Sequence, residues 1–256
     1  MNIITLFNKI KNTSKYETVN SFSFDNIFRN ISFFVAPLFY YLRLSPNMIS
    51  ILSLVMGLAG AIVIIIYGES ALSMGITLFF ISMVIDYCDG NIARLLDKTS
   101  FFGRFIDGLF GIIVVGTLQI SFLVILVNEL TSPYSIGNMN IDKIYIIAFC
   151  AFSIFSYPIQ HLIYDRYSSF ARWIKQEHNV DVAPTIKNEM SFSAIVFLDT
   201  LHYISILLGI INIEFLIVNF MVNLISAILL VSYHLYYCKK YMDISAKSHR
   251  STKDNP

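Results

Sequence analysis

Long apolar runs restrict the fold of this chain more than any other feature of its sequence. Five runs have the length of about 20 residues that a helix needs to cross a bilayer, at 47–67, 71–93, 105–127, 143–163 and 214–237. Because 56% of all residues are hydrophobic, the chain has more unbroken apolar sequence than a soluble domain would bury. The sequence therefore predicts an all-α integral membrane protein, since an isolated span can satisfy its backbone in lipid only as a helix.

A sixth run at 192–211 is long enough to span the membrane if Asp199 and His202 lie inside it. No internal repeat or low-complexity tract divides the chain, so we predict one membrane domain over residues 1–256. Its parts are an N-terminal cytoplasmic or interfacial segment at 1–44, a six-helix core at 45–238 and a cytoplasmic tail at 239–256. Within the core, two longer polar loops are predicted at about 128–142 and 164–190. In the first part, the aromatic-rich stretch 28–44 favours an amphipathic helix in the membrane interface.

The positive charges orient these spans. If six spans place both termini on one side, every Lys and Arg except Lys143 lies on that side. The positive-inside rule makes it the cytoplasmic side of an inner or cytoplasmic membrane. A net charge of +1 gives no field that would attract nucleic acid. The beginning of the chain lacks the apolar stretch and cleavage site of a secretory signal peptide, and the three isolated cysteines predict no disulfide framework.

Three carboxylates stand near the cytoplasmic ends of the second and third runs. Asp86 and Asp89 are one turn apart on one helix face, and a tight turn between antiparallel helices can bring Asp107 opposite them. Ionisable groups at that depth are costly and usually functional. Carboxylates that meet in a low dielectric have to protonate, pair with cations or bind a metal. Oxygen ligands of this kind suit Mg²⁺, Mn²⁺ or Ca²⁺.

The residues around the carboxylates are suited to a phosphate ligand. Gly90 lets a ligand approach the backbone closely, and Arg94, one turn further on, can pair with phosphate through two parallel hydrogen bonds. Gly103, Asp107 and Gly111 form one stripe at four-residue spacing. Each piece alone has a structural alternative, such as a positive-inside anchor, a packing seam of small residues or an ion pair. The spacing of all the pieces together favours a site that binds a metal and a pyrophosphate.

This pattern resembles the signature of the CDP-alcohol phosphotransferase (CDP-alcohol phosphatidyltransferase) family. The matching residues, in order, are Asp86, Asp89, Gly90, Ala93, Arg94, Gly103 and Asp107. The Ser45-Pro46-Asn47 segment before the first run is also similar to the family, as is the topology of six spans after an interfacial helix. At the last signature position, where the family has an aspartate, this sequence has Gly111.

The resemblance implies an enzyme of phospholipid or related lipid biosynthesis. Family members transfer a phospho-alcohol from a CDP-linked donor, such as CDP-diacylglycerol, to an alcohol acceptor and release CMP, and one of the partners is lipidic. It implies Mg²⁺ or Mn²⁺ held by Asp86, Asp89 and Asp107. It also implies a CDP site lined by Asp86, Gly90, Ala93, Arg94, Gly103 and Asp107. Membrane lipids are further expected partners and nucleic acid is not. A homodimer is possible, because family members are often dimers.

Gly111 leaves the catalytic base without an assignment. The aspartate that the family has there helps to bind metal and is its proposed general base, and glycine can do neither. Asp199 and His202 are one turn apart and lie at a depth in the membrane similar to that of Gly111, so they are candidate replacements for the missing aspartate. A polar pair that stabilises helix contacts is the simpler interpretation. His161 lies near a cytoplasmic helix end, where an interfacial anchor is expected.

Two other functions compete with the enzyme. Gly111 motivates the first, an impaired homologue that retains the nucleotide or lipid pocket and acts as a membrane binding subunit. The second is a small transporter. A transporter would be expected to carry charged residues at mid-membrane in several spans, whereas the carboxylate cluster lies near one face.

Overall fold

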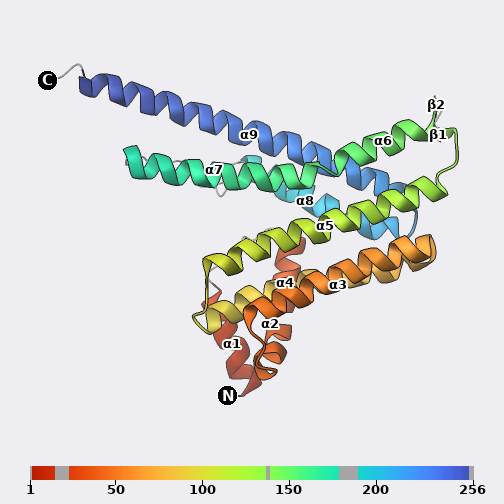
Figure 1. Ribbon diagram of the computed structural model, residues 1–256, viewed down its shortest axis with the longest axis horizontal. Helices are drawn as coiled ribbons and strands as arrows, with labels where there is room; N and C mark the ends of the chain where they lie inside the picture. Colours follow the sequence, from red (N-terminus) through yellow and green to blue (C-terminus); the bar gives the residue numbers. More distant parts are fainter. Residues whose placement is uncertain (1, 15–22, 137–138, 179–189, 254–256) are drawn as a thin grey trace.

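The computed structural model describes residues 2–14, 23–136, 139–178 and 190–253, and its helices run mostly alongside one another (Figure 1). Within these ranges it describes the backbone alone at 135–136, 139, 177–178, 190–196, 199 and 241–253. The helices α3 to α5 lie in one half of the molecule and α6 to α9 in the other, while α1 and α2 cross beside the ends of α3 and α4 (Figure 1).

The first two long helices, α3 (Pro46–Tyr67) and α4 (Leu72–Leu95), form an antiparallel pair. Ser45 caps α3 by accepting a hydrogen bond from the Met48 amide, and a 3₁₀ turn, η1 (Gly68–Ala71), joins the two helices. Gly68 adopts the left-handed backbone (φ 66°) that this reversal requires. At Gly75 a Cβ would lie only 2.7 Å from a backbone oxygen of α3. Glycine therefore allows the two helices to pack closely.

Helix α5 (Phe101–Glu129) begins at the Ser100 cap, whose hydroxyl accepts a hydrogen bond of 2.9 Å from the Gly103 amide. It packs on α3, where the Val114 side chain meets the surface left open by Gly57. Several of its buried residues, among them Leu118 and Phe122, belong to a core cluster that also includes residues of α4, α8 and α9. A short antiparallel hairpin, β1 (Tyr134–Ile136) and β2 (Met139–Ile141), follows α5.

Helices α6 (Lys143–Ser153) and α7 (Ser156–His178) replace the single fourth span predicted from the sequence. The helix is interrupted at residues 154–155, just before Pro158, whose ring would clash with the carbonyl of residue 154 in a continuous helix. The interpretation of residues 164–190 as a polar loop was wrong for its first part, because α7 continues to His178.

The last two long helices are α8 (Met190–Gly209) and α9 (Glu214–Lys253), and α9 extends well beyond the predicted end of its span. At the other end of the chain, α1 (Ile3–Thr13) and α2 (Phe24–Tyr41) precede the core. Helix α2 covers most of the predicted interfacial helix at 28–44. It packs on α4, where the Cys88 thiol lies 3.6 Å from the Ser32 carbonyl oxygen. Its place in a membrane interface stays a prediction.

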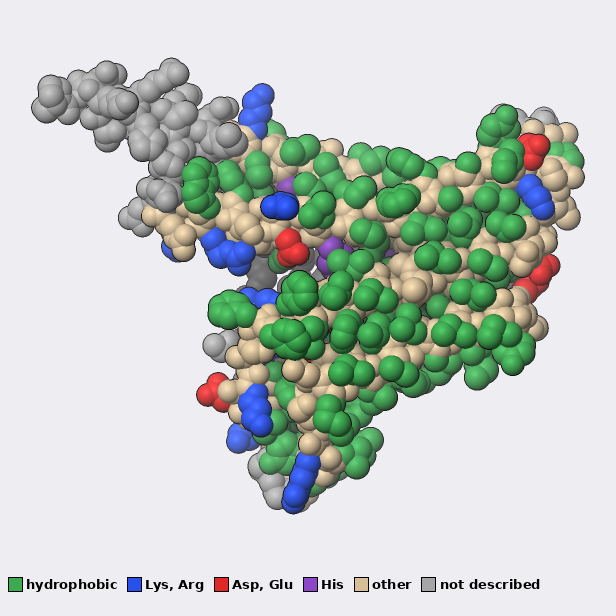
Figure 2. Space-filling model, viewed as in Figure 1, with side chains coloured by type: hydrophobic (Ala, Val, Ile, Leu, Met, Phe, Trp, Pro, Cys, Tyr) green, Lys and Arg blue, Asp and Glu red, His purple; other side chains and the backbone are tan. Residues whose placement is uncertain are grey.

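The described residues include four segments long and apolar enough to cross a membrane: Pro46–Leu95, Phe101–Glu129, Lys143–Gln176 and Glu214–Lys240. The first of them contains both α3 and α4, and Thr200–Gly209 within α8 is a shorter apolar stretch. Apolar side chains cover much of the face drawn in Figure 2, over both halves of the molecule. The prediction of an all-helical, multi-pass membrane protein is confirmed, while the number of six spans and their orientation stay predictions.

Candidate functional site

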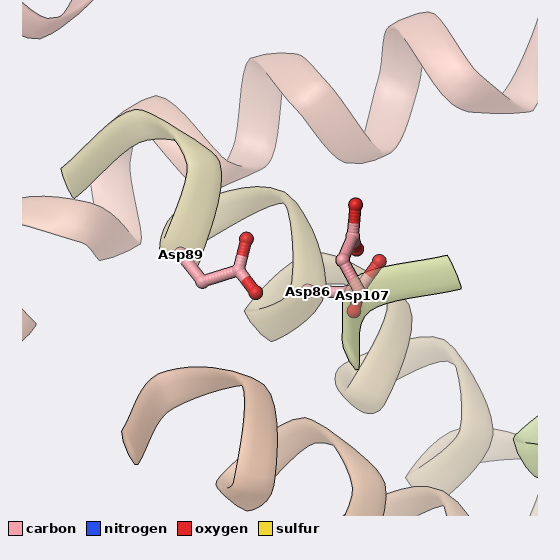
Figure 3. A group of neighbouring side chains, drawn as sticks. All are labelled: Asp86, Asp89 and Asp107. Carbon is pink, nitrogen blue, oxygen red and sulfur yellow. The ribbon is translucent and has the colours of Figure 1, made fainter. Parts of the chain in front are cut away.

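A tight corner between α4 and α5 builds the site. After α4 ends at Leu95, the Lys98 amide donates a hydrogen bond of 2.8 Å to the Ala93 carbonyl oxygen, and Asp97 adopts a left-handed backbone (φ 54°). Ser100 then starts α5. Because the corner is short, the first turns of α5 run back along the last turns of α4, and Asp107 comes opposite the aspartates of α4 (Figure 3).

Asp86, Asp89 and Asp107 form one cluster of carboxylates. One oxygen from each can be chosen so that all three lie within 4.8 Å of one another, and the three side chains point toward a common centre (Figure 3). Asp89 is buried, Asp86 is half-buried and Asp107 is exposed. The prediction that a turn brings these three side chains together is confirmed. Like charges this close repel one another, so a divalent cation at their centre would stabilise the arrangement.

Ser50 of α3 supports the cluster from a third helix. Its hydroxyl donates a hydrogen bond to Asp89 Oδ2, and both side chains are buried. A carboxylate that is held in this way keeps its orientation toward a metal. Ser50 had no predicted role, because only its place one turn after Pro46 pointed to this region.

Arg94 is held by a chain of side chains that reaches α2. Its Nη2 donates a hydrogen bond of 2.9 Å to Asn91 Oδ1, and Asn91 Nδ2 donates one of 2.8 Å to the Ser32 hydroxyl. A Cβ at Gly90 would lie 3.2 Å from Arg94 Nη1. Glycine therefore leaves room for the guanidinium to lie along the helix, and the arginine is held in place before any ligand binds.

These residues surround a cavity of about 210 Å³, which we call the motif cavity. Of the residues predicted to bind CDP, those that line it are Gly90, Ala93, Arg94, Gly103 and Asp107. Asp86 belongs to the carboxylate cluster and is not among the lining residues. Polar lining residues without a predicted role are Asn47, Ser50, Lys98, Thr99, Ser100 and Arg104. The cavity thus combines carboxylates with three cations, which suits a phosphate ligand held together with a metal.

A second cavity of about 720 Å³ lies between α5 and α7, and we call it the α5–α7 cavity. Arg104 and Asp107 line both cavities, so the two spaces meet at Asp107. On the other side, α7 contributes the side chains of Gln160, His161, Tyr164, Asp165 and Arg172. Figure 2 shows a hollow between the two halves of the molecule, with charged and histidine side chains around it. This wall was not predicted from the sequence, because residues 164–190 were expected to form a loop.

Gly111 lies beside open space. A Cβ built at this position meets no atom within 4 Å, so packing does not require glycine there. Of the predicted replacements, His202 is buried on α8, and its Nδ1 lies 2.9 Å from Asn219 Nδ2 of α9. Asn219 Nδ2 is also 3.0 Å from the Ser205 hydroxyl, so His202 has the contacts of a structural polar group. The Asp199 side chain lies outside the described residues, and a catalytic role for either residue stays a prediction.

Comparison with models of known protein families identifies the family of this chain. A family model described as CDP-alcohol phosphatidyltransferase matches residues 43–231, which include both cavities and the carboxylate cluster. No curated protein matches the chain. The match extends well beyond the short stretch on which the resemblance in the sequence rests, and covers α3 to α8 and part of α9.

Proposed function

The chain belongs to the CDP-alcohol phosphatidyltransferase family, and on that premise we propose that it transfers a phospho-alcohol from a CDP-linked donor to an alcohol acceptor and releases CMP. CDP-diacylglycerol is the expected type of donor. One observation carries the proposal: three carboxylates from α4 and α5 converge within 4.8 Å beside a cavity that Arg94 lines. Phosphoryl transfer depends mainly on positioning and on neutralising charge, and this arrangement supports both.

The donor set fits a hard divalent cation. Asp86, Asp89 and Asp107 offer only oxygen atoms, as Mg²⁺ and Mn²⁺ prefer, and these three residues would hold the ion. When bound, it would supply positive charge that stabilises the pyrophosphate as the bond to CMP breaks. Ser50 would keep Asp89 turned toward the ion through its hydrogen bond.

The other residues of the motif cavity would bind and orient the donor. Arg94 would pair with a phosphate, and Asn91 and Ser32 keep its guanidinium oriented. Gly90, Ala93 and Gly103 are small residues that line the cavity, so the nucleotide can approach the backbone there. Preorganised groups of this kind lose little freedom when the ligand binds.

The proposed topology has six spans in a single domain, formed by α3, α4, α5, the α6–α7 pair, α8 and the apolar part of α9. Helices α3, α4 and α8 have 22, 24 and 20 residues, which is long enough to cross. With both termini cytoplasmic, the carboxylate cluster lies near the cytoplasmic face, where a water-soluble nucleotide and a lipid can meet. Helix α2 would lie in the interface.

A second candidate function rests on Gly111. Without the aspartate of the family at this position, the protein could retain the CDP or lipid site and serve as a binding subunit without turnover. The open space at Gly111 allows the two functions to be separated by Gly111→Asp, because a Cβ at this position meets no atom within 4 Å.

The test is CMP release by the purified protein with Mg²⁺ or Mn²⁺, CDP-diacylglycerol and a panel of alcohols. We expect release by the wild type and loss of release in Asp89→Asn, while Asp97→Asn, a change in the exposed corner, retains it. Release by Gly111→Asp alone would favour the binding subunit. Absence of both CMP release and CDP binding from every variant would overturn the proposal.

A further inference from the structure

The acceptor alcohol has to lose a proton, and the residue that takes it is not in the signature. The hydroxyl oxygen becomes bonded to phosphorus, so its proton must pass to a base or to water. Gly111 has no side chain to accept it, and the three aspartates of the cluster are the predicted metal ligands. The wall around Asp107 is therefore the place to look for a base outside the signature.

The α5–α7 cavity is the space from which an acceptor can reach the cluster. It meets the motif cavity at Asp107 and Arg104, and its volume of about 720 Å³ lies in the range of about 300–1,000 Å³ that is usual for ligand pockets. Its α5 wall includes Gly108, where a Cβ would meet no atom within 4 Å. An alcohol in this cavity would have its hydroxyl between Asp107 of α5 and the polar side chains of α7.

His161 is the histidine of this cavity. Its ring packs against Tyr157, with the ring centroids 4.6 Å apart, and it is half-buried. Asp165, one turn further along α7, lines the same cavity and interacts electrostatically with the ring. A carboxylate beside an imidazole orients the ring and stabilises the cation that forms when it accepts a proton.

The charged and titratable groups that line the cavity with His161 come from two helices. Helix α5 contributes Arg104 and Asp107, and α7 contributes Tyr164, Asp165 and Arg172, whereas α9 contributes the apolar Leu230. Both signs of charge are thus present around the ring.

The two other histidines with described side chains have structural contacts. His202 Nδ1 lies 2.9 Å from Asn219 Nδ2, and His234 Nδ1 lies 2.7 Å from the Leu230 carbonyl oxygen. Both are buried, and neither is among the residues that line the motif cavity or the α5–α7 cavity. Among these three histidines, His161 alone shares a cavity with the carboxylate cluster.

We propose that His161 is the general base for the acceptor hydroxyl, in place of the aspartate that the family has at Gly111; this inference rests on the proposed function. The acceptor oxygen forms a bond to the β-phosphorus of the donor. The bond between that phosphorus and the oxygen bridging to the α-phosphate breaks, and CMP leaves with this oxygen and its electron pair. The hydroxyl proton passes to the unprotonated ring nitrogen of the neutral His161 side chain and from there to water. The products are CMP, the phosphodiester and one proton.

The experiment compares steady-state CMP release by wild type and His161→Gln, which retains a polar side chain that cannot take up a proton. We expect kcat to fall by about 10²–10⁴-fold, the usual contribution of a general base, with little change in KM for the CDP-linked donor. The decrease in kcat of the wild type at low pH, where the base is protonated, should be absent from the variant. His161→Asn provides a second substitution of the same kind, and Arg166→Gln, exposed on the same helix, serves as the matched control.

A double variant makes the test specific. Because Gly111 borders open space, Gly111→Asp should restore a base from α5, so His161→Gln with Gly111→Asp should regain much of the lost kcat. Binding of Mn²⁺ and CDP shows that each variant is folded. An active wild type with unchanged kcat and pH profile in His161→Gln would overturn the role of His161 and leave the proposed function standing. A wild type that binds CDP and Mn²⁺ but releases no CMP with any acceptor would overturn both.

Discussion

Asn91 Oδ1 accepts a hydrogen bond of 2.9 Å from Arg94 Nη2, and this contact connects the proposed phosphate site with α2. On its other side, Asn91 Nδ2 donates to the Ser32 hydroxyl, and Ser32 and Asn91 are both buried. One amide thereby fixes the arginine and joins two helices. The structure therefore predicts effects on both binding and stability.

Asn91→Ala should weaken CDP binding and lower the stability of the protein. The loss of the amide removes a partner of the Arg94 guanidinium and one of two partners of the buried Ser32 hydroxyl, which also donates to the Arg29 carbonyl oxygen. A buried polar group that loses its partner costs about 1–3 kcal/mol. We expect a higher KM for the donor and a lower melting temperature, measured by CMP release and by thermal unfolding in detergent. Asn91→Asp retains the acceptor for Arg94 and should preserve more of the CDP affinity than the alanine variant. Equal CDP affinity in both variants and wild type would show that Asn91 does not position Arg94.

Ser50→Ala should weaken metal binding. The Ser50 hydroxyl donates to Asp89 Oδ2, and loss of a hydrogen bond to a metal ligand usually lowers metal affinity by about 10–100-fold. Titration with Mn²⁺, followed by electron paramagnetic resonance, measures the change directly. Ser121→Ala, which removes a buried hydroxyl bonded only within α5, is the matched control. If the two variants bind Mn²⁺ equally well, Ser50 has no part in orienting Asp89.

The carboxylate cluster could be predicted from the sequence because short-range geometry fixes it. Asp86 and Asp89 share a face by helical periodicity, and the few residues between α4 and α5 force the chain to reverse, which brings Asp107 opposite them. The contact of Asn91 with Ser32 could not be predicted in this way. These residues are 59 positions apart, and their pairing depends on how α2 packs across α4.

The extension of α7 to His178 shows a different limit of sequence analysis. Hydropathy marks where a helix is apolar enough for lipid. The apolar run ends near residue 163, where polar residues begin. The helix continues because Tyr167 and Ile174 are buried in a cluster with Tyr237 of α9, a contact between segments far apart in the chain. His161 was interpreted as an interfacial anchor for a related reason, because a span that ends near residue 163 places it at a cytoplasmic helix end.

Divalent cations should stabilise the wild-type protein, and Asp107→Asn should reduce this effect. Three carboxylates with oxygens within 4.8 Å repel one another without a cation. A ligand that binds only the folded state adds about 2.7 kcal/mol when its concentration is about 100 times Kd. Thermal unfolding with and without Mg²⁺ should give a higher melting temperature with the ion, and a smaller rise for Asp107→Asn. Without the ion, the variant should melt above the wild type, because one repelling charge is gone. A rise as large in Asp107→Asn as in the wild type would mean that the cluster is not the metal site.

Gly75→Ala should destabilise the packing of α3 on α4, whereas Gly116→Ala should not harm α5. A Cβ at Gly75 would lie 2.3 Å from Ile64 Cγ1 and 2.7 Å from the Gly60 carbonyl oxygen, so the helices have to separate. Overpacking of this kind costs about 1–3 kcal/mol. At Gly116 a Cβ meets nothing within 4 Å, and alanine should favour the helix by up to about 1 kcal/mol. Thermal unfolding of the two variants measures the difference.

CMP release should fall in Gly75→Ala as well, because the same two helices hold Ser50 and Asp89 together. Equal melting temperatures for the two variants would show that α3 and α4 do not pack as closely as the backbone contact at Gly75 requires.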